Sequence, residues 1–149
     1  MTSSIKNVFS TMLAIDLETA LEEAKPWVTT EETVASAVGL AGPSQGAVCL
    51  QMSQVLARIS ASTMLGVPAD TLADMEVNDV VGELTNMVAG DLKSKLGEAN
   101  SACQLTVPTV IRGRGLQITT LDRRESCHYE RVYQTGPHLV GLLVALKSR

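Results

Sequence analysis

The most constraining feature of this chain is a long helical pattern of apolar residues in its middle. Six apolar side chains recur at spacings of three and four along this stretch: Val77, Val80, Val81, Leu84, Val88 and Leu92. At about 100° per residue these positions form one stripe, which is expected to face a hydrophobic core. The pattern predicts a helix from about Val77 to Gly97, with Asn78 as a candidate N-cap for a slightly later start. Other elements of the chain must supply the core that this helix covers.

The opposite side of the same helix carries a separate set of residues. Asp79, Glu83, Asn86 and Gly90 fall together on this second stripe, away from the apolar positions. A carboxylate and a carboxamide three residues apart point the same way from a helix, so Glu83 and Asn86 are candidates for chemistry at a docking surface. An ordinary solvated helix face has the same composition, so the pattern alone does not separate the two interpretations.

The segments that precede this helix alternate between helical and strand-like patterns. Residues 5–13 repeat apolar positions at helical spacing, and residues 18–27 are acidic and predict a connection or a short helix. Residues 33–40 and 47–52 predict two strands of a hairpin around a turn that contains glycine and proline. A second helix is predicted from a Ser53 cap to Gly66, where a helix commonly ends.

The pattern changes to short strands after the long helix. Strand-like runs are predicted at residues 103–107, 109–111, 116–121, 126–135 and 139–146. Several strands joined by tight turns indicate an antiparallel sheet. The order of helices and strands predicts an α+β fold in which long helices pack on an antiparallel β-sheet. With 149 residues, the chain fits one domain over residues 1–149.

Composition and charge narrow the class of partner. Aromatic residues make up only 3% of the chain and the net charge is −4, which argues against nucleic-acid binding through stacking or through phosphate contacts. The charge is uneven: the chain through Gly90 carries −8 and the remainder carries +4. An acidic front that contains Glu83 suits a basic patch on a protein partner.

The remaining reactive residue types form no recognisable site. Cys49, Cys103 and Cys127 are widely spaced and form no zinc-like set with His128 or His138, and the first two are expected in the core. Four arginines are expected on a solvated rim or in a subunit contact: Arg112, Arg114, Arg123 and Arg124. No signal-like segment or spanning apolar run is found, so a cytoplasmic protein without a membrane partner is expected.

Residues 78–93, which read NDVVGELTNMVAGDLK, closely resemble the signature helix of the CheC/CheX/FliY group of response-regulator phosphatases. That signature has an acidic or serine residue, three positions, Glu, two positions, Asn and a proline some twenty residues later. Asp79, Glu83 and Asn86 match its first three elements. Pro108 follows Asn86 after 21 intervening residues, one fewer than is usual in the family.

The number of signature copies separates the branches of this group. CheC-type proteins resemble a duplication that carries Glu-x-x-Asn on two helices, whereas this chain has one copy. The opening helix is also similar to the start of CheX-like domains. The resemblance therefore favours the CheX-like branch, with one copy per subunit, and it implies a homodimer in which the C-terminal strands join or exchange.

The resemblance implies an enzyme that removes the phosphoryl group from the aspartyl phosphate of a CheY-like receiver in chemotaxis or a related two-component pathway. Asn86 is the expected residue for orienting the attacking water, and Glu83 for reaching the receiver's active-site lysine. Asp79 and Gly90 are expected to contact the partner. No cofactor is expected on this chain, since the resemblance places the Mg²⁺ on the receiver.

Two other functions compete with this interpretation. A non-catalytic receiver-binding adaptor or flagellar switch-like component, as FliM-like relatives are, would share the fold without hydrolysing anything. The presence of both Glu83 and Asn86 argues against it. A small-molecule sensor would bind a ligand between the helices and the sheet, but few polar residues interrupt the predicted core.

Overall fold

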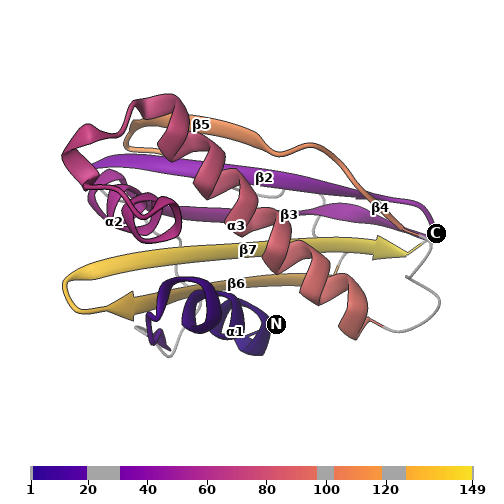
Figure 1. Ribbon diagram of the computed structural model, residues 1–149. Helices are drawn as coiled ribbons and strands as arrows, with labels where there is room; N and C mark the ends of the chain where they lie inside the picture. Colours follow the sequence, from indigo (N-terminus) through magenta and orange to yellow (C-terminus); the bar gives the residue numbers. More distant parts are fainter. Residues whose placement is uncertain (1, 20–30, 97–102, 119–126, 149) are drawn as a thin grey trace.

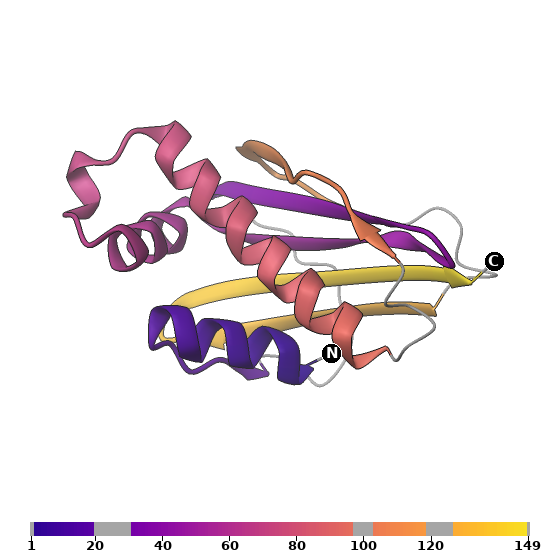
Figure 2. The same ribbon diagram turned by 45° about the vertical axis from the view of Figure 1, so that its right-hand side comes forward.

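In the part of the chain that the computed structural model describes, three α-helices lie on one face of an antiparallel β-sheet (Figure 1). The structure describes residues 2–19, 31–96, 103–118 and 127–148. Figure 2 shows the same two layers after rotation, with α3 lying diagonally across the sheet. This arrangement confirms the predicted α+β class, with helices packed on an antiparallel sheet.

The described elements alternate much as the sequence predicted. The helices are α1 (Thr2–Leu13), α2 (Gln54–Leu65), the short 3-10 helix η1 (Ala69–Thr71) and α3 (Asp74–Lys95). The strands are β1 (Glu18–Thr19), β2 (Glu32–Ala41), β3 (Ser44–Ser53), β4 (Gln104–Leu105), β5 (Thr109–Arg114), β6 (Cys127–Thr135) and β7 (His138–Ser148). None of the helices in the described part of the chain is long and apolar enough to cross a membrane.

The order of the strands in the sheet differs from their order in the chain. The neighbours run β1-β6-β7-β3-β2-β4, and β5 also pairs with β2. All of these pairings are antiparallel, and the register aligns Cys49 of β3 with Ala37 of β2 on one side and with Leu143 of β7 on the other. The last strand, β7, therefore occupies the middle of the sheet, between β6 and β3.

The core lies between the helices and the sheet. Alternate residues of the long strands face the helices, because successive side chains of a strand point to opposite faces. Val48, Leu50 and Met52 of β3 are buried in this way, and so are Phe9 of α1 and Leu56 of α2. Burial of apolar surface of this kind is the main favourable contribution to folding.

Local signals predicted the hairpin and α2 correctly. The backbone N–H of Leu56 donates to Ser53 Oγ at 3.2 Å, so Ser53 is the N-cap. Gly66 ends the helix in the left-handed conformation, with φ of 69°. The hairpin turn is tighter than predicted, because β2 continues to Ala41 and β3 begins at Ser44.

Several predicted boundaries were wrong. Asn78 is not a cap, because α3 begins at Asp74. Residues 18–19 form strand β1 against β6 instead of a connection or helix, and the rest of that segment lies outside the described residues. Only Gln104–Leu105 of the run at 103–107 is a strand, and residues 116–118 are irregular.

Candidate functional site

Helix α3 is held at both ends by contacts that suit its dipole. The Glu76 side chain accepts a hydrogen bond from the backbone N–H of Ala73 at 3.0 Å and so satisfies one of the free donors at the start of the helix. Asp74 and Glu76 lie in the first turn, and Lys93 and Lys95 lie in the last turn. Acidic groups at the first turn and basic groups at the last both stabilise a helix.

The apolar stripe of α3 is buried as the sequence predicted. Its six members, Val77, Val80, Val81, Leu84, Val88 and Leu92, are all in the core. The helix packs mainly against β2 and α2, with further contacts to α1 and β3. One side of the helix is therefore anchored along its length, so its other side is displayed on a rigid support.

The signature residues lie on that displayed side. Asp79 and Glu83 are exposed, and Asn86 and Gly90 are partly exposed. We call these four residues the signature stripe. In the described part of the chain, no hydrogen bond or ion pair engages the side chain of Asp79, Glu83 or Asn86. The carboxylates and the carboxamide are therefore available to an external partner.

Pro108 lies directly against α3, although 21 residues separate it from Asn86. A Cβ placed on Gly82 would lie 3.2 Å from Pro108 Cβ and 3.7 Å from Val110 Cγ2. Farther along the helix, a Cβ on Gly90 would lie 4.0 Å from Leu105 Cδ1. The segment from Leu105 to Val110 thus runs alongside the helix and borders the signature stripe. The shortened spacing to Pro108 leaves this contact in place.

A charged cluster fastens the first turns of α3 to β5. Arg112 Nε donates to Asn78 Oδ1, and Arg112 Nη1 lies 3.7 Å from Asp74 Oδ1 and 3.9 Å from Glu32 Oε1. Arg58 of α2 also pairs with Asp74, at 2.9 Å. The expectation that Arg112 lies on a solvated rim was therefore wrong. The alternating pattern of a strand was the sequence signal for a partly buried Arg112. No sequence pattern indicated its hydrogen-bond acceptor, Asn78, which lies 34 residues away in the chain.

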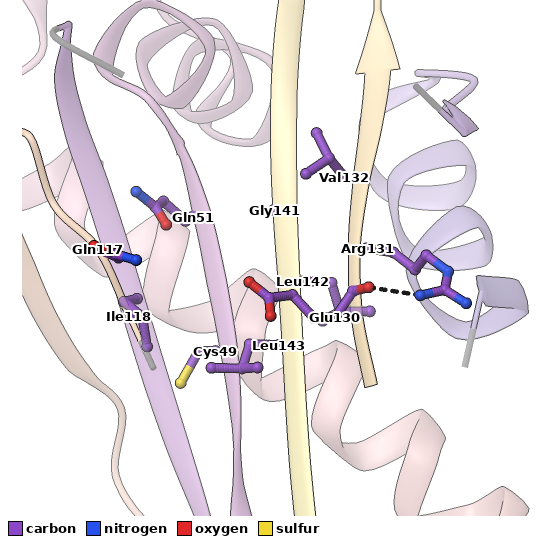
Figure 3. Close-up of a pocket in the computed structure, with 10 residues that line it drawn as sticks. All are labelled: Cys49, Gln51, Gln117, Ile118, Glu130, Arg131, Val132, Gly141, Leu142 and Leu143. Atoms are coloured by element: carbon purple, nitrogen blue, oxygen red, sulfur yellow. Dashed lines mark hydrogen bonds between the residues drawn. The ribbon is translucent and has the colours of Figure 1, made fainter. Parts of the chain in front are cut away.

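A small hollow lies on the other face of the sheet (Figure 3). Cys49, Gln51, Glu130 and Leu143 contribute to its lining, and the strand register places the first, third and fourth in one row. Burial raises the pKa of the Cys49 thiol, which keeps it protonated and a poor nucleophile. This hollow is separated from the signature stripe by the thickness of the sheet and of the helical layer.

The other candidate groups are not gathered at the stripe. His128 lies on β6 and His138 begins β7, while the strand that α3 contacts most is β2. Cys49 and Cys103 are buried, as predicted. Among the residues that the structure describes, no three His, Cys, Asp or Glu side chains are grouped to hold a metal ion. Chemistry at the stripe would rest on the carboxylates and on the carboxamide of Asn86.

Comparison with known proteins supports the resemblance found in the sequence. The family profile described as "Chemotaxis phosphatase CheX" matches residues 34–130. CheY-P phosphatase CheX of Thermotoga maritima is 27% identical over 115 residues, which cover 77% of this chain and 74% of that protein. The crystal structure of chemotaxis protein CheX from Vibrio vulnificus is 26% identical, covers 98% of this chain and 93% of its own, and has a TM-score of 0.76.

A second similar structure contains a partner. The CheX–CheY–BeF3–Mg²⁺ complex from Borrelia burgdorferi includes a chain that is 20% identical to this one, with 99% and 95% of the two chains covered and a TM-score of 0.68. At that identity the similarity shows the fold. The profile match extends over more than half of this chain, so the chain belongs to the CheX family of chemotaxis phosphatases. It is a phosphatase, and hence a hydrolase.

Proposed function

We propose that this protein hydrolyses the aspartyl phosphate of a CheY-like receiver domain in chemotaxis or a related two-component pathway. The observation that carries the proposal is the pairing of exposed Glu83 with partly exposed Asn86 on a helix anchored along its whole opposite side. The proposal also draws on the similarity to a protein named CheY-P phosphatase. A site on the outer surface of the helical layer suits a protein substrate, which can bring its own active site to it.

Asn86 has the task of orienting the attacking water. Its carboxamide can accept a hydrogen bond from the water and also donate one, and it does not titrate near neutral pH. The water oxygen attacks phosphorus as the bond from phosphorus to the aspartyl oxygen breaks. The aspartate leaves as a carboxylate, and the water's proton passes to the departing inorganic phosphate or to solvent. Positioning of this kind is most of what a catalyst adds to phosphoryl transfer.

Glu83 has the task of setting the docking register. Its carboxylate, one turn before Asn86, would pair with the lysine beside the receiver's phosphorylation site. Asp79 would extend the same acidic edge, and Gly90 would leave room for the partner's backbone. Charge pairs across an interface contribute orientation and specificity more than affinity. The receiver would also hold the Mg²⁺, which would stabilise charge on the phosphoryl oxygens.

Replacing Asn86 by alanine tests the water-positioning role. Asn86→Ala should lower stimulated dephosphorylation of a receiver at least about 100-fold, because the water loses its orientation, while receiver binding stays near normal. Phosphate release from a phosphorylated CheY-like receiver measures the rate. Asn7→Ala, on the exposed side of α1, is a matched control that should keep the wild-type rate. A wild-type rate in Asn86→Ala would show that the role is wrong.

Charge reversal at Glu83 tests the docking role separately. Glu83→Lys should weaken receiver binding by placing a cation opposite the partner's lysine. Asp70→Lys, in exposed η1, makes the same charge change away from the stripe and should leave the affinity unchanged. Equal affinities of Glu83→Lys and the wild type in a titration would show that Glu83 does not form the proposed ion pair. Binding by Asn86→Ala without hydrolysis also distinguishes an enzyme from a receiver-binding adaptor, which would be unaffected in both assays.

We also propose that the protein forms a homodimer through the C-terminal part of the sheet. Among the described residues, β1 pairs with only Tyr133 and Gln134 of the nine-residue strand β6. Unpaired backbone groups along a strand edge favour pairing with another chain. Sedimentation should give a dimer mass at micromolar concentration. A monomer mass that does not change with concentration would contradict the proposal.

A further inference from the structure

The two most exposed large apolar side chains in the described part of the chain both lie beside the signature stripe. Val107 is 85% exposed and Met75 is 74% exposed. A single exposed apolar residue is ordinary on a protein surface. Two of them bordering the same set of polar residues form a pattern that internal packing does not explain, because neither contributes to the core.

Met75 lies at one end of the stripe. It is in the first turn of α3, four residues before Asp79 and eleven before Asn86. At 3.6 residues per turn these offsets place Met75 within about 40° of Asp79 and about 20° of Asn86 around the helix. A partner that contacts Asn86 and Asp79 along the helix therefore reaches Met75 as well.

Val107 lies beside the middle of the stripe. Its neighbours in the chain, Leu105 and Pro108, lie next to Gly90 and Gly82, and Asn86 is midway between these two glycines on the helix. The segment from Leu105 to Pro108 thus passes Asn86 between those two contacts.

Val107 is also held on a fixed support. Thr106 exchanges two hydrogen bonds with Gly39 of β2, one from its backbone N–H at 2.9 Å and one to its Oγ1 at 2.8 Å. The residue before Val107 is therefore fastened to the sheet, and Pro108 after it is fastened against α3.

The chemistry proposed for Asn86 gives these apolar residues a use. A water that attacks phosphorus must be held in one orientation, and bulk water around it competes for the same hydrogen bonds. Protein interfaces commonly surround their decisive polar contacts with side chains whose role is to exclude water. Val107 borders the water-orienting residue in this way, and Met75, about three turns away on the same side of α3, offers a flexible thioether that adapts readily to a partner's surface.

We propose that Met75 and Val107 are the apolar anchors of the receiver-binding surface, one at the end and one at the side of the signature stripe. This inference rests on the proposed function. The partner that occupies this surface is the phosphorylated receiver. It must present apolar side chains on both sides of its phosphorylation site as well as a cation opposite Glu83. The anchors hold the receiver through apolar contacts, while Asn86 orients the water.

Single aspartate substitutions at the two anchors test the inference. Met75→Asp and Val107→Asp should each raise the KM for a phosphorylated CheY-like receiver at least about tenfold and leave kcat within about twofold of the wild type. The affinity for the same receiver charged with BeF3⁻ and Mg²⁺ should fall by the same factor. Val55→Asp, at a 59% exposed position on α2, is the matched control and should change neither value. Unchanged melting temperatures would show that all three variants are folded.

The outcomes separate the two proposals. If both anchor variants keep the KM and affinity of Val55→Asp while Asn86→Ala loses activity, the anchors are wrong and the proposed function stands. If an anchor variant lowers kcat at saturating receiver without raising KM, the residue does not act by binding and the inference fails. If Asn86→Ala keeps the wild-type rate, the proposed function fails and the inference that rests on it fails too.

Discussion

Alanine substitutions at the two glycines inside α3 should have opposite effects on stability. Gly82 and Gly90 have the same helical environment, in which alanine is favoured over glycine by about 1 kcal/mol. They differ in what a new methyl group would meet. At Gly90 the nearest heavy atom outside the helix is Leu105 Cδ1 at 4.0 Å, which is an ordinary contact distance. At Gly82 it is Pro108 Cβ at 3.2 Å, with Pro108 Cγ at 3.6 Å and Val110 Cγ2 at 3.7 Å.

The magnitudes follow from these distances. Gly90→Ala should raise the free energy of unfolding by about 0.5–1 kcal/mol, because alanine has the higher helix propensity and its methyl group meets no steric clash. For a chain of this size that is about 2 °C in Tm. Gly82→Ala gains the same helix propensity, but its methyl group must push Pro108 away from the helix by a few tenths of an ångström. Overpacking typically costs about 1–3 kcal/mol, so Gly82→Ala should be less stable than Gly90→Ala by about that amount.

Urea and thermal unfolding of the two variants and the wild type measure this difference. The comparison is internally controlled, because both substitutions add one methyl group to one helix. Equal stabilisation by Gly82→Ala and Gly90→Ala would refute the reasoning, since it would mean that Pro108 is not held against α3. A loss of stability in Gly90→Ala would show instead that the helix is strained at that position.

The same pair of variants also tests the role of Gly90 in partner binding. If Gly90 leaves room for the backbone of the receiver, its added methyl group should weaken binding of a BeF3⁻-charged receiver by about tenfold while the fold becomes more stable. Unchanged affinity in a titration would remove Gly90 from the binding surface and leave the stability argument intact.

Three further perturbations have simpler expectations. Ser53→Ala should cost about 1 kcal/mol of stability in urea unfolding through loss of the α2 cap, and an unchanged midpoint would contradict the cap. Asn78→Ala should cost about 1–3 kcal/mol because it leaves the Nε of partly buried Arg112 without its acceptor, whereas a neutral effect would show that the contact is not formed. The hydrogen bond with Lys95 lowers the pKa of Asp91. The ionised carboxylate therefore stabilises the folded state at pH values above the unfolded-state pKa of about 4, and this stabilisation is lost as the pH falls through the folded-state pKa. Asp91→Asn should therefore lower the Tm slightly near neutral pH and progressively less as the pH falls below about 4, and a constant difference would exclude the carboxylate as the cause.

Local patterns predicted the parts of the fold that depend on local physics. The burial of the apolar stripe of α3 follows from spacing, and the Ser53 cap follows from the hydrogen bond that its hydroxyl offers. The start of α3 was missed because Ala73 carries no capping group and the cap comes from Glu76, three residues later. A strand pattern also does not say which strand is its neighbour, so the position of β7 between β3 and β6 could not be predicted.

The candidate site also has features that local patterns predicted and features that they could not predict. The helical period was enough to place Asp79, Glu83 and Asn86 on one face, and the structure confirms that placement. The contact of Pro108 with Gly82 and the hydrogen bond from Arg112 to Asn78 join residues far apart in the chain, which no local pattern reports. The exposed positions of Met75 and Val107 likewise depend on tertiary packing. The roles of the signature residues stay predictions until the variants are measured.

The position of β7 in the sheet has a consequence for how the protein folds. Strand β7 is the last element described, yet its backbone pairs with both β3 and β6. A partly folded chain in which β7 is still unpaired has β2 and β3 on one side and β6 on the other, without the strand that joins them in the sheet. Helix α3 then has only part of the surface that its apolar stripe needs. The sheet should therefore be completed only when β7 pairs with both neighbours, and the long sequence separation of β3 from β7 should make that step slow.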